Sequence, residues 1–297
     1  MTDDDPLRAL LLDVYDGLPR QGPGDDASSQ RALELCTDLP VTPDVLDIGC
    51  GPGMQTVLLA QATGGTITAV DRHEQFLDEL RARAAEAGVR DRTLIMRADM
   101  ADLPFGRHAF DLIWCEGAAY IMGISNAFEG WKPFLRPRGY LVVSELVWLT
   151  ADVPTELREF FHGEYPGITD VPGNVARIEG CGYEVVGHFT IPDEAWWTHY
   201  YDPLTARLAE ARERYADDPE AIRFVESSEE ELRLRRTYPD AYGYEFFVTR
   251  LLDPDANREA GDREVVPMAD APPDEPIAPE PEAPEELPRP QFPPPLD

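Results

Sequence analysis

The 297-residue sequence predicts an α/β domain built around a mainly parallel sheet. Short apolar runs alternate with helical patterns along the chain, and a glycine-rich turn follows the first of these runs. Apolar strands that alternate with helices are typical of βαβ units, whose parallel strands are covered on both faces. Hydrophobic residues make up 43% of the chain, which is enough for a packed core.

Seven apolar runs are expected to form the strands of this sheet. They are Val45–Ile48, Thr66–Asp71, Thr93–Ala98, Phe110–Cys115, Tyr140–Val147, Tyr183–Ile191 and Tyr242–Leu251. Helical patterns follow three of the runs, at Met54–Ala62, Glu74–Ala87 and Asn126–Leu135. The stretch Asp99–Ala109, between the third and fourth runs, is expected to be a loop or a short helix.

Helical segments are also expected before and after the alternating region. Leu7–Leu18 and Ser28–Leu39 precede the sheet, and Ser28 or Ser29 can cap the second of them. Three later segments surround one strand and an aromatic cluster: Thr155–Phe161, Pro203–Tyr215 and Pro219–Arg236. We therefore expect N-terminal helices and a lid at residues 1–42, and one domain at 43–252 with an elaboration at 150–240. Residues 253–297 are rich in proline and acids, which predicts a disordered tail.

The charge of the chain limits its partners. A net charge of −31 repels nucleic acid, because phosphate binding needs Lys and Arg, and it also repels an anionic membrane. No apolar run approaches the roughly 20 residues that a membrane helix needs, and the acidic N-terminus lacks a signal segment. The four cysteines are scattered without a CxxC pair, so no metal site is expected. We expect a cytoplasmic protein with a small-molecule substrate; its oligomeric state is left open.

The central motif is DIGCGPG at residues 47–53, where a buried strand ends in a glycine loop that opens a helix. Glycines let a backbone turn sharply and approach a ligand closely. A dinucleotide would also suit such a turn, but Met54 stands where its fingerprint has a third glycine. Asp47, at the strand end, would repel a pyrophosphate. It favours a ligand with an ammonium group instead.

Two further acids end the next two strands. Asp71 can accept hydrogen bonds from both hydroxyls of a ribose, and Asp99 can accept one from an adenine amino group beside the soft side chain of Met100. Each acid alone could simply cap a helix. Three acids at successive strand ends, all at the edge where open α/β sheets bind ligands, predict a nucleoside site beside the glycine loop.

The DIGCGPG loop, Asp71, Asp99 and the LRPRGYL turn at residues 135–141 resemble class I S-adenosylmethionine (SAM)-dependent methyltransferases. The resemblance covers about residues 5–250. It implies a Rossmann-like seven-stranded sheet with helices on both faces, an antiparallel last strand and a helical, aromatic lid insertion. The closer resemblance is to small-molecule methyltransferases of the menaquinone-biosynthesis type. A group of these carries an Arg-Gln-Gly-Pro-Gly loop, here Arg20–Gly24, and a Trp-x-x-His-Tyr segment, here Trp196–Tyr200.

The resemblance and the motif positions together name the residues expected to bind SAM. They are Arg20, Asp47, Gly49, Cys50, Gly51, Gly53, Asp71, Arg72, Asp99, Met100 and Glu116. In similar proteins the N-terminal region folds over the cofactor, so Arg20 is expected to clamp the methionine carboxylate through its guanidinium. The alternative is an ordinary turn between helices with Arg20 facing solvent.

Methyl transfer from a sulfonium requires mainly positioning of the reactants, because the leaving group is already activated. Catalytic residues are therefore hard to identify from the sequence. Glu116, after the fourth strand, could accept a proton or hold a cationic amine, or it could only favour a helix N-terminus. Among the histidines, His199 is expected to be catalytic. The residues expected to bind substrate are Tyr120, Glu145, Trp148, Trp196, His199 and Tyr200. Aromatic rings among acids suit a partly apolar substrate with positive charge, although the same rings could form only the core of the lid.

We therefore expect SAM-dependent methyl transfer to a small-molecule acceptor by in-line displacement. Two alternatives stay open at this point. One is an NAD(P)-dependent oxidoreductase, which the missing third glycine disfavours. The other is a non-catalytic regulator that binds SAM and uses its tail for partners.

Overall fold

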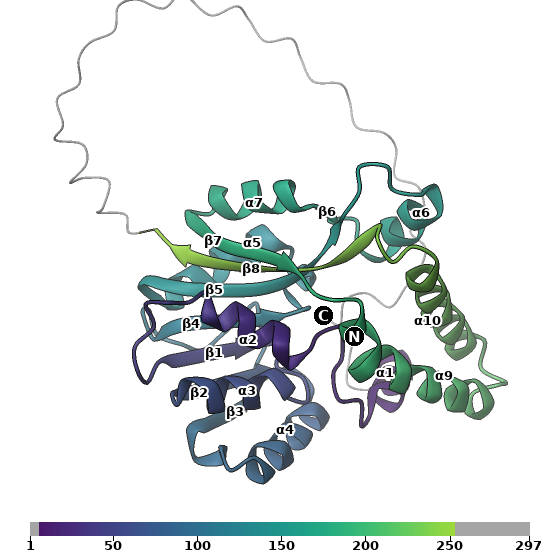
Figure 1. Cartoon of the computed structure of the whole chain (residues 1–297). Coiled ribbons are helices and arrows are strands. Elements are labelled where there is room, and N and C mark those ends of the chain that lie inside the picture. The colour runs from purple at the N-terminus through teal and green to yellow at the C-terminus, as the bar shows by residue number, and fades with distance from the viewer. Residues whose placement is uncertain (1–5, 253–297) are drawn as a thin grey trace, which may run out of the picture.

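The computed structural model describes residues 6–252 as an α/β domain with a helical extension (Figure 1). The acidic tail expected at 253–297 lies outside the described residues. Within the described range, no helix combines the length and the apolar character that crossing a bilayer requires.

The sheet has the strand order β3-β2-β1-β4-β5-β8-β7. These strands are β1 (Asp44–Ile48), β2 (Thr66–Asp71), β3 (Thr93–Arg97), β4 (Phe110–Glu116), β5 (Leu135–Trp148), β7 (Tyr183–Thr190) and β8 (Tyr242–Leu251). The first five strands are parallel, and β8 is antiparallel to both β5 and β7. The expected Rossmann-like sheet with an antiparallel last strand is confirmed. A two-residue strand, β6 (Thr169–Asp170), adds an eighth member by pairing with β5.

The strand β5 begins at Leu135, whereas the sequence predicted a start at Tyr140. Leu135 already pairs with Phe110 on β4, and the register then shifts so that Tyr140 pairs with Leu112. The guanidinium of Arg136 donates to Asp111 on β4 at 2.5 Å and to Asp44 on β1 at 2.8 Å. These contacts hold the start of β5 against its neighbours before the apolar run begins.

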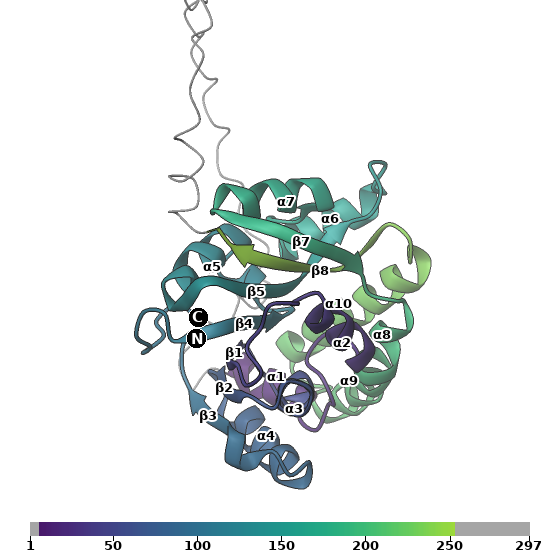
Figure 2. The ribbon, with the colours of Figure 1, turned by 60° about the vertical axis from the view of Figure 1, so that its left-hand side comes forward.

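Helices cover both faces of the sheet because successive strand residues point to opposite sides. Val45 packs with the core of α2 (Asp26–Glu34), α3 (Met54–Thr63) and α4 (Glu74–Glu86). Leu46 packs with the core of α5 (Ile124–Trp131) and α7 (Val171–Gly180). Figure 2 shows α2 and α3 on one side of the strands and α5 on the other.

Two helical features differ from the sequence prediction. The helix α2 is capped by Asp25, whose carboxylate accepts from the backbone N–H of Ser28 at 2.6 Å, so neither Ser28 nor Ser29 is the cap. The helix α7 was not predicted. It begins after Asp170, whose side chain accepts from the N–H of Gly173, and this cap and the proline in the first turn both favour a helix start.

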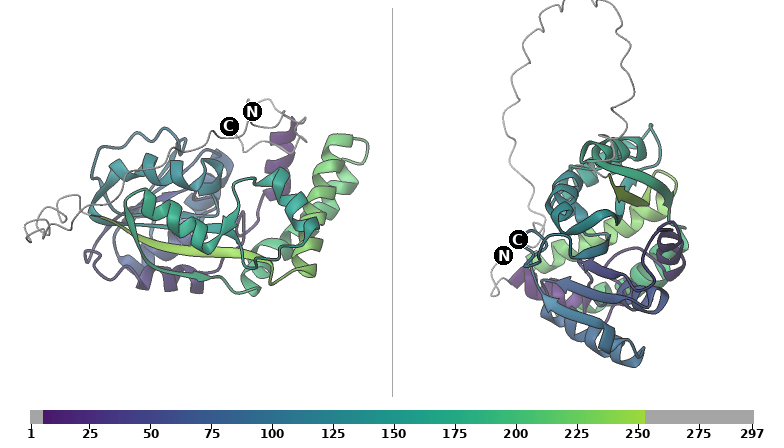
Figure 3. Two further views of the ribbon diagram at one scale, coloured as in Figure 1. Left: turned by 90° about the horizontal axis from the view of Figure 1, so that it is seen from above. Right: turned by 90° about the vertical axis from the view of Figure 1, so that its left-hand side faces the viewer.

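The remaining helices form what we call the helical cap, which comprises α1 (Pro6–Tyr15), α6 (Thr155–Glu164) and residues 194–237. The last stretch contains α8 (Glu194–Trp196), a π-helical turn (Trp197–Tyr201), α9 (Asp202–Arg214) and α10 (Pro219–Thr237). Figure 3 shows α1 and α10 gathered beyond one end of the sheet. Ion pairs from Asp13 to Arg207 and Arg214 join α1 to α9, so segments far apart in sequence form one cap.

Candidate functional site

A cavity of about 630 Å³ lies between the carboxyl edge of the sheet and the helical cap. Its glycine-loop half is lined by residues 20–23, 49–52, 71–73, 98–101 and 116–118. Its aromatic half is lined by Tyr15, Tyr120, Leu146, Phe160, Phe161, Glu164, Tyr165, Trp196, Tyr200, Phe224, Ser227, Ser228, Glu231 and Tyr244. The segment that follows β4 joins the two halves.

The glycine loop bends over the end of β2. The backbone N–H groups of Gly49 and Cys50 both donate to the carbonyl of Val70, at 2.9 and 3.0 Å. Gly49 has a φ of +69°, and a Cβ there would stand 2.8 Å from the Cβ of Ala118. Position 49 therefore requires glycine, both for its positive φ and because a side chain would collide with Ala118. Gly49, Cys50 and Gly51 all line the cavity, as the sequence predicted.

Gly53 was predicted to bind the cofactor, but it does not line the cavity. Its φ is +82°, and a Cβ there would come within 2.1 Å of Leu80 Cδ1 on α4. The residue lets α3 begin close against α4. Its role in this structure is helix packing, and the sequence motif alone could not separate packing from binding.

Asp71 is held at the cavity wall by the loops on both sides of it. Its Oδ2 accepts from the N–H of Gly51 at 3.0 Å, and its Oδ1 accepts from the N–H of His73 at 2.9 Å. The His73 ring also approaches Oδ1, with Nδ1 at 3.1 Å. His73 lines the cavity and was missed by the sequence analysis; its position two residues after a strand-end acid was the available signal.

The third strand end contributes Asp99 and Met100, and Arg72 extends the wall beside them. The Asp99 side chain accepts from the N–H of Ala101 at 2.9 Å, which fixes the turn after β3. The carbonyl of Met100 accepts from the indole of Trp131 at 2.9 Å. All three residues predicted here lie in the glycine-loop half.

Asp47 does not face the cavity, contrary to the prediction that it meets an ammonium group. Its side chain is fully buried and accepts from Thr56 Oγ1 at 2.6 Å on α3. Burial raises the pKa of this carboxyl to about 7, against the opposing effect of the Thr56 hydrogen bond. The side chain points beneath the loop toward α3, so the loop separates it from the ligand space.

Arg20 and Glu116 form an ion pair at 2.6 Å, and each side chain is 5% exposed. Glu116 also accepts from Ser29 Oγ at 2.6 Å and from Trp114 Nε1 at 2.8 Å. Both carboxylate oxygens therefore have donors, which argues against the predicted role of Glu116 as a proton acceptor. The Arg20 guanidinium meets the Glu116 carboxylate rather than solvent, so the solvent-facing alternative is wrong.

The loop that carries Arg20 is fitted tightly between the cap and the sheet. A Cβ at Gly24 would stand 2.8 Å from Arg20 Nη1, so this glycine makes room for the guanidinium. The N–H of Gly24 donates to the carbonyl of Ala195 at 3.0 Å. The loop thus connects β4 to the cap, and its residues 20–23 line the cavity.

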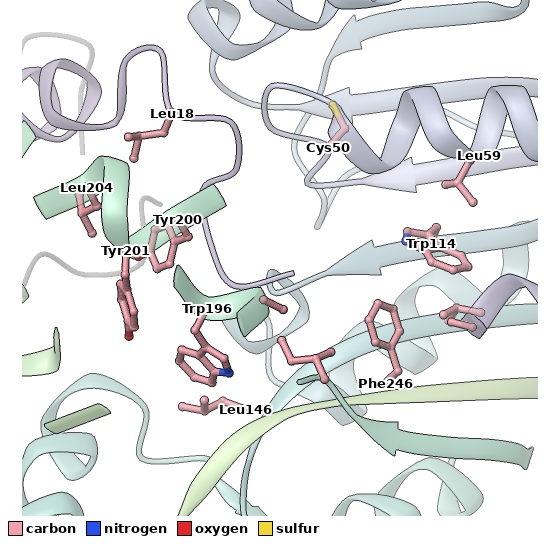
Figure 4. Packing of buried hydrophobic residues seen from close by; sticks show 14 of the residues in the cluster. Leu18, Cys50, Leu59, Trp114, Leu146, Trp196, Tyr200, Tyr201, Leu204 and Phe246 are labelled. Atoms are coloured by element: carbon pink, nitrogen blue, oxygen red, sulfur yellow. The ribbon is translucent and has the colours of Figure 1, made fainter. Parts of the chain in front are cut away.

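Three of the predicted substrate residues, Tyr120, Trp196 and Tyr200, line the aromatic half. In Figure 4, Trp196 stands over Leu146, with Tyr200 on the adjoining turn. The phenolic oxygens of Tyr200 and Tyr15 lie 3.3 Å apart, which brings α1 to this wall.

The other three predicted substrate residues do not line the cavity. Glu145 is buried behind it, and burial raises the pKa of its carboxyl to about 8. Trp148 packs edge-to-face on Phe161, with ring centroids 5.7 Å apart. His199 lies on the π-helical turn and does not line the cavity, whereas Trp196, just before the turn, and Tyr200, within it, both do. Regular α-helical spacing would place residues 199 and 200 on the same face as residue 196, so it could not separate His199 from Tyr200.

Two acids in the aromatic half were missed by the sequence analysis. Glu164 ends α6 and Glu231 lies on α10. Burial, together with the negative charge of Glu231, raises the pKa of Glu164 to about 8. Burial also raises the pKa of Glu231, which accepts from the hydroxyl of Tyr201 at 2.7 Å. No local motif marks these positions, because only the folding of the cap brings the two helices together.

Comparison with known proteins supports the cofactor interpretation of the glycine-loop half. A family described as a methyltransferase domain matches residues 45–139. Methyltransferase GfsG of Streptomyces halstedii is 32% identical over 104 residues, which are 35% of this chain and 37% of the relative. The uncharacterized protein YjhP of Escherichia coli is 27% identical over 158 residues, 52% of this chain and 63% of the relative. The chain thus spans between about a third and two thirds of the length of these relatives.

Solved structures share the fold over most of the chain. A SAM-dependent methyltransferase from Geobacter sulfurreducens, crystallised with S-adenosylhomocysteine (SAH), aligns with a TM-score of 0.69 at 21% identity. The alignment covers 84% of this chain and 99% of that one. The structure of E. coli YjhP aligns with a TM-score of 0.67 at 21% identity, covering 81% and 98%. Residues 45–139 thus match a methyltransferase domain, and the described part of the chain shares its fold with solved SAM-dependent methyltransferases.

Proposed function

We propose that this chain binds SAM in the glycine-loop half of the cavity and transfers its methyl group to a small molecule in the aromatic half. The observation that carries the proposal is a single cavity with two chemically different halves. One half presents a glycine loop and strand-end acids, and the other presents aromatic rings. The halves meet beside Glu116, at the end of β4.

Unsatisfied polar atoms in the glycine-loop half fit a nucleoside amino acid. His73 Nε2, Gln21 Oε1 and Arg20 Nε are buried and find no hydrogen-bond partner among the described residues, although their residues line this half. Buried polar groups normally have partners, so these atoms indicate a polar ligand. Asp71 would hold the ribose hydroxyls, and Asp99 would hold the adenine amino group. Arg20 and Gln21 belong to the N-terminal lid itself.

The residues of this chain would act mainly by positioning. When bound, SAM supplies a methyl group on a positively charged sulfur, which is already activated for transfer. The helical cap and the described N-terminal residues 6–42 would exclude water and hold the acceptor in line. Glu116 holds Arg20, Ser29 and Trp114 in place, so we assign it a positioning role and propose no general base.

Several observations favour a small-molecule acceptor. One relative is named for methylating 27-O-demethylrifamycin SV, and others for methylating sterols. A net charge of −31 is unsuited to binding nucleic acid. The narrower menaquinone-type resemblance and the cytoplasmic location stay predictions, and no specific observation favours a dehydrogenase or a non-catalytic regulator.

The proposal is tested by following a deuterated methyl group from SAM into a panel of metabolites by mass spectrometry. We expect a labelled product with the wild type and with Asp91→Asn, an exposed acid outside the cavity. We expect little product with Asp71→Asn, because this change disturbs the acceptor for the ribose. Tight SAM binding by the wild type without transfer to any compound in a broad metabolite extract would instead indicate a SAM-binding regulator.

A further inference from the structure

The aromatic half of the cavity contains two carboxylates and no basic side chain among the described residues that line it. Glu164 Oε1 is buried and has no hydrogen-bond partner in the described part of the chain. Glu231 is partly buried and accepts from Tyr201, a neutral donor, at 2.7 Å. Two carboxylates in partial burial hold their negative charge poorly, which raises the pKa of both, and a positive charge beside them would favour the charged form. None of the described residues that line this half supplies one.

Aromatic rings line the same half of the cavity as the two carboxylates. The rings of Tyr15 and Tyr200 stack with centroids 6.4 Å apart, and those of Tyr120 and Tyr165 lie 5.5 Å apart. Burial raises the pKa of Tyr15, and the charges of Glu231 and Glu164, which line the same half, raise it further. Ring faces attract organic cations, and they do so most strongly where water is excluded.

A second, independent feature indicates that this half receives a ligand. Trp196 lines the cavity and is 1% exposed, yet its indole Nε1 finds no acceptor among the described residues. Arg235 stacks on the Trp196 ring at 4.1 Å, but it is paired with Asp193 and does not line the cavity. Figure 4 shows Trp196 standing at this wall above Leu146. A buried donor without an acceptor is uncommon in a folded protein and is satisfied when a ligand brings one.

We propose that the aromatic half recognises a substrate that carries a cationic amine, whose charge lies between Glu164 and Glu231 and among the surrounding rings. The inference rests on the proposed function, because it treats this half as the site of the methyl acceptor. The amine would supply the positive charge that the wall lacks. It is a recognition group, and the atom that receives the methyl group is not assigned by it.

The test compares two probes of similar shape and different charge in the wild-type protein. Benzyltrimethylammonium carries a permanent positive charge, and neopentylbenzene is its neutral counterpart. Binding is measured by Trp fluorescence and calorimetry in the presence of SAH. We expect the cation to bind at least about tenfold more tightly, since the attraction of a quaternary ammonium to ring faces in a site that excludes water is at least this strong. Equal binding of the two probes, or no binding of the cation, would overturn the proposal.

Matched variants locate the contact. Glu164→Gln and Glu231→Gln should each lower the affinity for the cation by about tenfold. Neither should change the affinity for the neutral probe. Glu159→Gln on α6 and Glu226→Gln on α10 remove the same charge from exposed positions of the same helices, and should leave cation binding at the wild-type value. Unchanged cation affinity in both cavity variants would place the cation elsewhere. The two-probe comparison needs no variant, so it decides the question even if a variant is unstable.

Separate SAH titrations keep this inference distinct from the proposed function. If SAH binds and the cation does not, the amine class is wrong and the methyltransferase proposal stands. If the cation binds with the expected variant pattern and SAH does not, the cofactor assignment fails and the cation site remains.

Discussion

The buried ion pair between Arg20 and Glu116 allows a sharp test of how the N-terminal loop is held. Each side chain is 5% exposed, and the two charges meet at 2.6 Å. Arg20→Met removes the cation and leaves a buried carboxylate. Breaking such a pair costs about 3–5 kcal/mol when the remaining charge is uncompensated. Ser29 and Trp114 still donate to Glu116, so we expect the lower end of this range, about 3 kcal/mol.

Urea unfolding of a double-mutant cycle measures this energy directly. Glu116→Gln should also be destabilising, because it leaves the buried Arg20 charge with only the longer contact to the exposed Asp26, at 3.5 Å. The double variant should cost less than the sum of the single variants by about 1–3 kcal/mol. Arg81→Met is the control, because Arg81 is 41% exposed and its pairs with Glu74 and Asp78 should contribute less than about 1 kcal/mol. Additive costs, or an Arg20→Met cost no larger than the control, would refute this account of the loop.

Two further changes test the corrected roles of motif residues. Burial raises the pKa of Asp47 from 3.8 to about 7, so the folded protein retains a proton that the unfolded chain loses. The free energy of unfolding should therefore fall as pH rises from about 4 to 7. Asp47→Asn should flatten this dependence in urea melts, and an unchanged slope would contradict the assignment. Gly53→Ala should lower the melting temperature more than Gly88→Ala does. Both glycines have a positive φ, but only at Gly53 would the added Cβ collide with Leu80. Equal losses of melting temperature would show that packing against α4 is unimportant.

The sheet and the glycine loop were predictable because their signals are local. Apart from the start of β5, the strand bounds follow from apolar runs, and the strand-end acids Asp71 and Asp99 had to reach one edge because parallel strands end together. The motif did not show which side of the loop each member faces. Asp47 and Gly53 face the protein interior, where Asp47 accepts from Thr56 and Gly53 packs against Leu80. No sequence pattern indicates those neighbours.

The aromatic half was predictable only in part. Trp196 and Tyr200 were identified from their segment, but His199, on a π-helical turn, does not line the cavity, and this turn leaves no periodic signal. Glu164 and Glu231 were missed because they lie on helices that meet only when the cap closes over the sheet. Tertiary packing, not local sequence, decides which acids share a cavity.

Calorimetric titration of SAH into the wild type, Asp71→Asn and Asp91→Asn tests the central claim most directly. Asp71 accepts from the N–H groups of Gly51 and His73 at the cavity wall, so its replacement disturbs both the ribose acceptor and the loop that surrounds it. We expect SAH to bind the wild type and Asp91→Asn alike, and to bind Asp71→Asn at least about tenfold more weakly, the effect of losing one charge-assisted hydrogen bond. A wild type that does not bind SAH, or an Asp71→Asn variant that binds it equally well, would contradict the assignment of this edge of the sheet to the cofactor.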